Sequence, residues 1–271
     1  MEKTKKDGIG IIIPSYKPKN YIEKCLESLE LQTFDKKNFK VYIILNGEKE
    51  VYFNYLKKVT KKFTFNLELI HIAKKGVSYA RNLGIALNEY KYILFIDDDD
   101  FISKNFLKDI YIYRQENGIV FSNTISLNSE KGFELDYLGV DFLKNYKKDN
   151  ISLLNSRKQL SNSCGKLISS KIILNIRYKE NLSIGEDSLF MAMLSKNIRS
   201  IIYSSKEIIY YRNIRNDSCS RTKITFKKIK NDVYLIAYYL ILLLKRYNKI
   251  FILSRILGTI KRNLILIKGE K

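Results

Sequence analysis

Four consecutive carboxylates, Asp97–Asp100, end an apolar run in the stretch YILFIDDDDFIS. Adjacent carboxylates repel one another, and burial makes their charge more costly unless a cation compensates it. A hard divalent cation, Mg²⁺ or Mn²⁺, binds one or two carboxylates together with substrate phosphates. In the structural alternative, Asp99, Asp100 or Ser103 caps a helix that begins near Asn105, and the other carboxylates are solvated. A helix cap needs one side chain rather than four, so a metal site is the favoured interpretation.

A second acidic pair, Glu186 and Asp187, lies in the stretch LSIGEDSLFMAM at the start of an apolar-periodic helix. Carboxylates there also interact favourably with the helix dipole, which is the structural alternative. In the functional interpretation, one of them is a general base that removes a proton from an attacking hydroxyl. The single histidine, His71, lies in an alternating strand pattern, so a histidine-bound zinc site is excluded.

The chain contains neither GxGxxG nor GxxxxGK[ST], so it lacks both of these glycine-rich phosphate loops. If the protein binds a nucleotide, its phosphates must be held by a metal ion and by side chains. Arg81 and Asn82, in GVSYARNLG, lie on a helix just before the acidic stretch and could reach such a site. Alternatively, they belong to a solvated helix face.

The elements that position these residues alternate between apolar runs and helical periodicity. Asn20 and Glu23 have the spacing of a capping box at the first helix. The alternation predicts an α/β fold with a mostly parallel, doubly wound sheet, whose ligands bind beyond the carboxyl ends of the strands. The predicted strands are 9–14, 39–47, 67–72 and 91–96, and the predicted helices are 20–32, 51–63 and 77–89.

The rest of the chain is less regular. Residues 127–160 are polar and predict a long loop or short hairpins over one face of the site. A helix at 186–197 and strands at 198–205 and 206–214 follow. Beyond Arg221 the pattern becomes helical with basic interruptions. We therefore expect a main domain over 8–222 and a helical segment over 223–271.

The 271 residues carry a net charge of +21, and the excess is concentrated near the C-terminus. Residues 221–271 contain 13 basic and 2 acidic residues, which suits nucleic acid or an anionic membrane surface, unless a biased composition explains it. The longest clean apolar run, Val233–Leu244, has 12 residues, whereas a membrane-spanning helix needs about 18.

Three well-separated cysteines argue against a disulfide framework and a thiolate zinc site, and favour a reducing cytoplasm. The apolar run near the N-terminus is too short for the core of a signal peptide. We therefore expect a cytoplasmic protein.

Six ordered blocks together resemble the glycosyltransferase family 2 enzymes with the GT-A fold. The resemblance runs from about Gly8 to Arg221. Its blocks are IIIPSY, QTF at 32–34, GVSYARNLG, FIDDDDFI, IRYKENLSIGEDSLF and YYRNIRNDSCSR.

The resemblance implies transfer of a sugar from a nucleotide diphosphate donor with inversion at the anomeric carbon. The family pattern D-x-D-D falls on Asp97–Asp100, which makes Asp99 the candidate metal contact and places Asp97 beside the ribose and the metal. Asp187 becomes the catalytic base, and Glu186 lies near the acceptor. The implied donor-binding residues are Pro14, Ser15, Tyr16, Asn46, Arg81, Asn82, Asp97, Asp98, Lys166 and Arg212, although Asp98 and Asp100 could simply shape the turn.

Two departures from the family pattern concern the donor. The second strand ends in ILNG, whereas most relatives have an acidic pair there that recognises the nucleotide base. Asn46 at this position can both accept and donate hydrogen bonds. The stretch NSCGKL, with Lys166, lacks the aromatic residue that many relatives carry there. A UDP-sugar is the expected donor.

The chain contains no tryptophan, so the QxxRW motif of processive synthases is absent, and we expect transfer of one sugar per encounter. Arg212, Arg215 or Arg221 could assist the leaving group from a closing loop. The expected acceptor is a glycan or lipid-linked glycan of a bacterial surface polysaccharide such as capsule. The basic C-terminal helices are expected either to lie on the anionic membrane surface or to complete the core.

Three other functions are weighed against sugar transfer. A non-catalytic nucleotide- or carbohydrate-binding protein would leave both carboxylate clusters unexplained. A sugar nucleotidyltransferase would normally carry a glycine-rich N-terminal loop. Nucleic-acid binding is suggested only by charge, since no recognised motif appears, and it is not expected.

Overall fold

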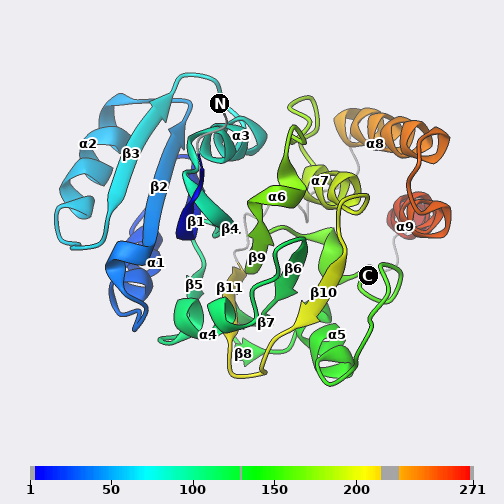
Figure 1. The fold of residues 1–271 in the computed structure, drawn as a ribbon. Helices are drawn as coiled ribbons and strands as arrows, with labels where there is room; N and C mark the ends of the chain where they lie inside the picture. The colour runs from blue at the N-terminus through cyan, green and yellow to red at the C-terminus, as the bar shows by residue number, and fades with distance from the viewer. Residues whose placement is uncertain (1–3, 129, 215–225, 269–271) are drawn as a thin grey trace.

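The computed structural model describes residues 4–128, 130–214 and 226–268, and its centre is a seven-stranded sheet (Figure 1). All neighbouring strands are parallel except at β9, which is antiparallel to both β4 and β6. In sheet order the strands are β10 (Ser200–Tyr203), β6 (Gly118–Phe121), β9 (Lys166–Ser169), β4 (Tyr90–Phe95), β1 (Lys6–Ser15), β2 (Phe39–Asn46) and β3 (Leu67–Ile72). The mostly parallel α/β sheet predicted from the sequence is confirmed.

A smaller four-stranded sheet follows the acidic stretch directly. Its order is β5 (Phe101–Ile102), β11 (Ile209–Ile214), β7 (Asn123–Asn128) and β8 (Gly132–Glu134). β11 is antiparallel to β5 and parallel to β7, so β11 returns beside the strand that follows the carboxylates. The β7–β8 pair only overlaps the start of the region 127–160, where a long loop or short hairpins were expected, and that region also forms a helix, α5, that was not predicted.

The helices lie mainly beside the large sheet, with α1 and α2 near β1–β3 and α7 to α9 at the other end of the molecule (Figure 1). The α-helices are α1 (Tyr21–Glu30), α2 (Glu50–Thr60), α3 (Val77–Leu87), α4 (Phe106–Ile112), α5 (Tyr137–Asn145), α6 (Ser170–Ile173), α7 (Glu186–Leu194), α8 (Phe226–Leu244) and α9 (Lys249–Lys268). Short 3₁₀ turns are η1 (Lys36–Asn38) and η2 (Gln159–Ser161).

The expected capping box at α1 is wrong. Asn20 is the N-cap residue, but its backbone is helical, with φ −57° and ψ −20°, and its side chain makes no capping hydrogen bond. Glu23 instead accepts hydrogen bonds from Tyr55 and Lys62. Contacts with α2 and the turn after it therefore outweigh the local capping pattern.

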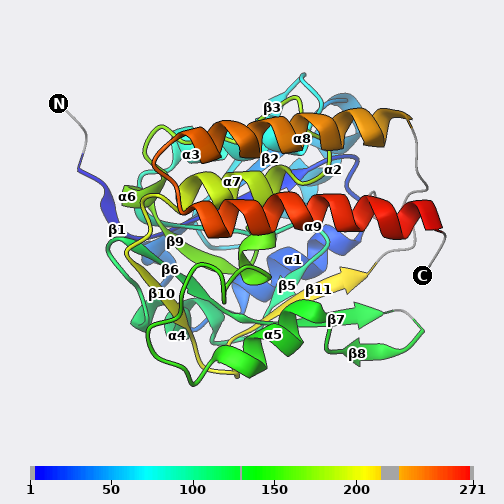
Figure 2. The same cartoon turned by 90° about the vertical axis from the view of Figure 1, so that its right-hand side faces the viewer.

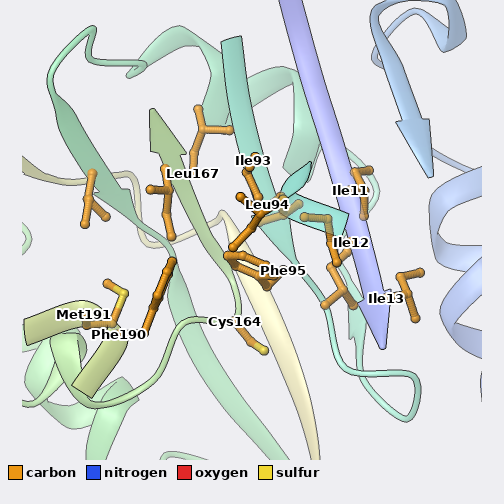
Figure 3. Packing of buried hydrophobic residues seen from close by; sticks show 14 of the residues in the cluster. Ile11, Ile12, Ile13, Ile93, Leu94, Phe95, Cys164, Leu167, Phe190 and Met191 are labelled. Atoms are coloured by element: carbon orange, nitrogen blue, oxygen red, sulfur yellow. The ribbon is translucent and has the colours of Figure 1, made fainter. Parts of the chain in front are cut away.

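The core between β1, β4 and α7 fixes the strand ends that carry the polar residues. Figure 3 shows Ile12 of β1, Phe95 of β4 and Phe190 of α7 in this cluster, and all three are fully buried. The rings of Phe95 and Phe190 meet edge to face at 6.1 Å. Burial of such side chains contributes roughly 1.5–3 kcal/mol each.

The chain ends in a hairpin of α8 and α9 whose inner side packs on the domain (Figure 2). Leu235 and Tyr239 of α8 and Phe251 and Ile252 of α9 are buried. The expected boundary near residue 222 lies outside the described residues. Among the residues that the structure describes, none belongs to a helix long and apolar enough to cross a bilayer.

Candidate active site

The carboxyl ends of β1 and β2 meet the acidic turn after β4. The Ser15 hydroxyl donates to Asp98 Oδ2 at 2.6 Å. Asn46 Nδ2 donates to the Ser15 carbonyl at 2.8 Å, and Asn46 Oδ1 accepts from the Gly76 amide at 2.9 Å. The amide group of Asn46 therefore ties together three loops, and its contact with a nucleotide base stays a prediction.

Asp100 fastens the acidic turn to β11. Its Oδ2 accepts from the Tyr210 hydroxyl at 2.5 Å, and its Oδ1 accepts from the Asn213 amide at 2.8 Å. Burial, reinforced by the charges of Asp99 and Asp97, raises the pKa of Asp100 well above its usual value. The N-cap of α4 is Asn105, which makes no side-chain capping bond. Asp98 and Asp100 are thus the buried members of the run, and both help to shape the turn.

Arg81 joins the two acidic motifs. Its Nη2 donates to Asp97 Oδ1 at 2.8 Å, and its Nη1 donates to Asp187 Oδ1 at 2.7 Å. Its Nη1 also lies 3.5 Å from Glu186 Oε1. The Arg81 side chain is only 3% exposed. Carboxylates about ninety residues apart in sequence therefore belong to one charged cluster.

The packing of α3 brings Arg81 to this position. A Cβ at Gly84 would lie 2.5 Å from Ile12 Cγ2, so glycine allows α3 to approach β1 closely. The guanidinium also lies over the Tyr178 ring at 5.4 Å. Burial opposes its charge, but Asp187 and Asp97 outweigh burial and raise the pKa of Arg81 well above its usual value. A fixed positive charge thus holds the carboxylates together.

Glu186 and Asp187 begin α7, as the sequence predicted. The preceding residue, Gly185, has φ +81°, a left-handed conformation that favours glycine. Ser163 donates to Asp187 Oδ1 at 2.7 Å, so both described hydrogen bonds to this carboxylate end on the same oxygen. Burial, followed by the charge of Asp187, raises the pKa of Glu186 to about 7. Glu186 therefore holds its proton more tightly than an exposed glutamate does.

Asn231 of α8 clamps the turn before these carboxylates, a role that the sequence analysis missed. Its Oδ1 accepts from the amides of Ser183, at 2.8 Å, and Ile184, at 3.3 Å, and its Nδ2 donates to the Ile184 carbonyl at 2.8 Å. About two turns after Asn231 on α8, the hydroxyl of Tyr239 lies 2.8 Å from that of Ser188 on α7. Three buried polar residues, Lys228, Asn231 and Asp232, lie near the start of α8, so no single residue there signals this role in the sequence.

Tyr16 lies at the mouth of the β1–β2 end and is 38% exposed. The Lys75 ammonium lies 4.6 Å from its ring centroid, and that of Lys17 lies 5.9 Å away. A Cβ at Gly47 would contact the same ring. Pro14 lies within β1, in register with Ile44 of β2. This arrangement leaves a partly exposed aromatic face near two cations, which suits a base next to a phosphate.

Lys166 and Arg212 form a second basic group near the site. Lys166 is buried, its Nζ donates to the Cys164 carbonyl at 3.0 Å, and burial lowers its pKa to about 8. Arg212 Nη1 lies 3.0 Å from Asp136 Oδ2. Arg212 belongs to β11 rather than to a loop, because it pairs with Ser126 of β7. Arg215 and Arg221 lie outside the described residues.

Asn82 holds the segment after α6 in place. Its Nδ2 donates to the Tyr178 carbonyl at 3.0 Å, and its Oδ1 accepts from the Tyr178 amide at 2.8 Å. It is therefore not a merely solvated residue. Contact of the donor with Asn82, or with the buried Arg81, stays a prediction.

Asp97 and Asp99 are the two half-buried carboxylates of the acidic run. Within the described ranges, no three His, Cys, Asp or Glu side chains are grouped closely enough to hold a metal ion. A divalent ion here would take two carboxylates from the protein and its other ligands from phosphates and water, which is the usual arrangement for Mg²⁺ in nucleotide sites. The residues present therefore fit such an ion.

Comparison with known proteins identifies the family. The model of the family described as "Glycosyl transferase family 2" matches residues 10–172. The chain belongs to glycosyl transferase family 2. The match contains the ends of β1, β2 and β4, and with them the acidic run.

Curated relatives of this family member are bacterial glycosyltransferases. The glycosyltransferase GlyA of Streptococcus pneumoniae is 28% identical over 79% of this chain and 32% of its own length. The poly(ribitol-phosphate) β-N-acetylglucosaminyltransferase TarS of Staphylococcus aureus is 26% identical over 76% of this chain and 35% of its own length. The chain thus spans about a third of the length of these relatives.

Solved structures have the same fold. S. aureus TarS 1–349 in complex with UDP-GlcNAc superposes with a TM-score of 0.76 at 23% identity, covering 93% of this chain and 72% of that one. A Pyrobaculum calidifontis mannosyltransferase in complex with GDP-Man and Mn²⁺ gives a TM-score of 0.64 at 11% identity, over 93% of this chain and 68% of that one. The family 2 chain described here therefore has the GT-A fold.

Proposed function

We propose that this chain transfers a single sugar, with inversion, from a nucleotide diphosphate sugar to a hydroxyl of a glycan or lipid-linked glycan. The observation that carries the proposal is the Arg81 bridge between Asp97 and Asp187, at 2.8 and 2.7 Å. It joins the carboxylate turn on the donor side to a candidate base. The binding-protein and nucleotidyltransferase alternatives give no reason for this pairing.

In the proposed mechanism, Asp187 is the general base. Its described hydrogen bonds end on Oδ1, so Oδ2 accepts the proton of the acceptor hydroxyl. The acceptor oxygen then forms a bond to the anomeric carbon while the bond from that carbon to the diphosphate oxygen breaks. The nucleoside diphosphate leaves with the electron pair on the opposite face of the sugar.

Asp97 and Asp99 would hold Mn²⁺ or Mg²⁺. A divalent ion at this position supplies electrostatic stabilisation of the charge that develops on the diphosphate. On the protein side, Lys166 and Arg212 add positive charge near the donor, and Tyr16 offers its ring to the base. TarS has been solved with UDP-GlcNAc, which supports a UDP-sugar here, while the mannosyltransferase complex with GDP-Man keeps GDP as the alternative.

The relatives' names support a bacterial surface polymer as the product, because TarS and the Bacillus subtilis minor teichoic acid biosynthesis protein GgaB are both relatives of this chain. A capsule or teichoic acid-like polysaccharide, built at the cytoplasmic face of the membrane, fits this class. We assign the transfer to residues 8–222, and 223–271 to a supporting helical segment.

Donor turnover in the presence of Mn²⁺ tests this function. The wild-type chain should release UDP from UDP-sugars, with acceptor-dependent transfer and an inverted anomeric configuration in the product. Asp187→Asn should lower the turnover by about 10²–10⁴-fold while UDP binding is retained, because only proton removal is lost. Near-normal turnover in this variant would exclude Asp187 as the base.

A further inference from the structure

The outer face of the α8–α9 hairpin carries two exposed apolar stripes. Their members lie three to seven residues apart, on the side of each helix opposite to the buried residues, and are between 41% and 90% exposed. The stripe residues are Val233, Leu240 and Leu244 on α8 and Leu253, Leu257 and Ile260 on α9. Below, "outer face" means these six side chains.

The inner faces of the same two helices are packed against the rest of the domain. Leu235 and Tyr239 of α8, and Phe251 and Ile256 of α9, are buried. Figure 2 shows α8 and α9 running alongside each other on the side of the molecule that faces the viewer, with α7 visible between them. The apolar outer face is therefore not needed to hold the hairpin on the domain, and exposing it to water is unfavourable.

The exposed charges on this hairpin are all positive over residues 228–262. The one carboxylate in that range, Asp232, is buried and lies 2.5 Å from Arg262. The exposed cations are Lys245, Arg246 and Lys249 at the turn between the helices, and Lys230 and Lys261 at the opposite end. The apolar stripes thus lie between two groups of cations.

An interfacial helix in a bilayer has this distribution, because its apolar side enters the acyl boundary while Lys and Arg reach the headgroups. A symmetric contact with a second copy would instead set the cations of one hairpin near those of the other. We propose that the outer face of α8–α9 docks on the surface of a bilayer that contains anionic lipids.

This docking would place the catalytic turn close to the lipid. The inner side of α8 holds Ser183 and Ile184 through Asn231, so the Glu186–Asp187 pair lies about one helix diameter, ~10 Å, from the bound surface. A lipid-linked acceptor would then reach the site without leaving the membrane. That consequence rests on the proposed function, whereas the docking itself does not.

Vesicle co-sedimentation tests the docking without any transfer reaction. The wild-type chain should sediment with vesicles of phosphatidylcholine and phosphatidylglycerol, and less at high salt. Leu253→Asp/Leu257→Asp should abolish binding. Lys245→Glu/Arg246→Glu should weaken it, by at least about fivefold for each cation lost.

Matched controls use exposed positions on α2. Val51→Asp replaces a residue that is 70% exposed, and Lys57→Glu/Lys58→Glu reverses two exposed lysines. Both controls should bind vesicles like the wild type, and circular dichroism checks the fold of every variant. The proposal is overturned if the wild type does not sediment, or if hairpin and control variants bind equally. A dimer in sedimentation equilibrium that the Leu253→Asp/Leu257→Asp variant dissociates, with no vesicle binding, would instead assign the face to a second copy.

Discussion

At the scale of single residues, Glu186 links the charge state of the site to pH. Burial and the charge of Asp187 raise its pKa from 4.5 to about 7. The folded chain therefore holds a proton that the unfolded chain has lost at intermediate pH. The stability that this proton contributes is fully present below pH 4.5 and is lost as the pH rises through about 7.

Glu186→Gln should remove the loss of stability that the wild type shows as the pH rises, because glutamine does not titrate. Relative to the wild type, the free energy of unfolding of the variant should rise between about pH 4.5 and about pH 7, by up to about 3 kcal/mol. Urea unfolding at several pH values measures the difference. Glu50→Gln, at the first residue of α2 and exposed, is the control and should change little. Parallel pH profiles for the wild type and Glu186→Gln would contradict this assignment.

The sequence indicated candidate site residues but not the contacts between them. Asp97 and Asp187 stood out as candidates because carboxylates at strand and helix ends are local patterns. Their link through Arg81 depends on the close packing of α3 on β1, and the hydrogen bonds from Ser163 and Tyr210 come from segments that converge only in the folded chain. A single sequence gives no local signal for such long-range contacts.

At the scale of elements, α8 supports the turn that precedes Asp187, the proposed base. Asn231→Ala would leave two amides and a carbonyl of that turn without their side-chain partner, and each lost hydrogen bond costs about 0.5–1.5 kcal/mol. Because the turn positions Asp187, kcat should fall, by up to about 100-fold, while the dissociation constant for UDP stays close to the wild-type value.

Steady-state kinetics and UDP titration of Asn231→Ala check this separation. Asn54→Ala, an exposed asparagine on α2, is the matched control and should leave both quantities unchanged. Unchanged kcat in Asn231→Ala, or an equal loss of UDP affinity, would mean that Asn231 does not position the base.

The predicted elements agree with the structure where the pattern is long and periodic. Strand 67–72 has the observed bounds, and the first three helices differ by three residues or fewer at each end. β9 and α5 were missed because β9 has only four residues and α5 lies in a polar region. The capping box predicted at Asn20 does not form, because the Glu23 side chain accepts hydrogen bonds from Tyr55 and Lys62 instead.

At the scale of the whole molecule, the acidic cluster and the basic hairpin lie in different places. The cluster carboxylates lie at the end of β4 and the start of α7, while the exposed cations of the hairpin lie at its turn and at its opposite end. The mostly parallel sheet could be predicted from the alternation of apolar runs with helices, and the ligand site beyond the strand ends stays a prediction. The packing of the hairpin on α7 could not be predicted, because the sequence was compatible with both a packed and a membrane-bound helix pair.

The most direct test of the central claim is a thermal-shift panel of nucleotide diphosphates with and without Mn²⁺. We expect UDP to stabilise the wild-type chain only when Mn²⁺ is present, by about 2.7 kcal/mol at a ligand concentration of one hundred times Kd. Asp99→Asn should lose this response. Stabilisation by no nucleotide diphosphate, or equal stabilisation of the wild type without metal and of Asp99→Asn, would contradict a metal-dependent nucleotide-sugar site at the acidic turn.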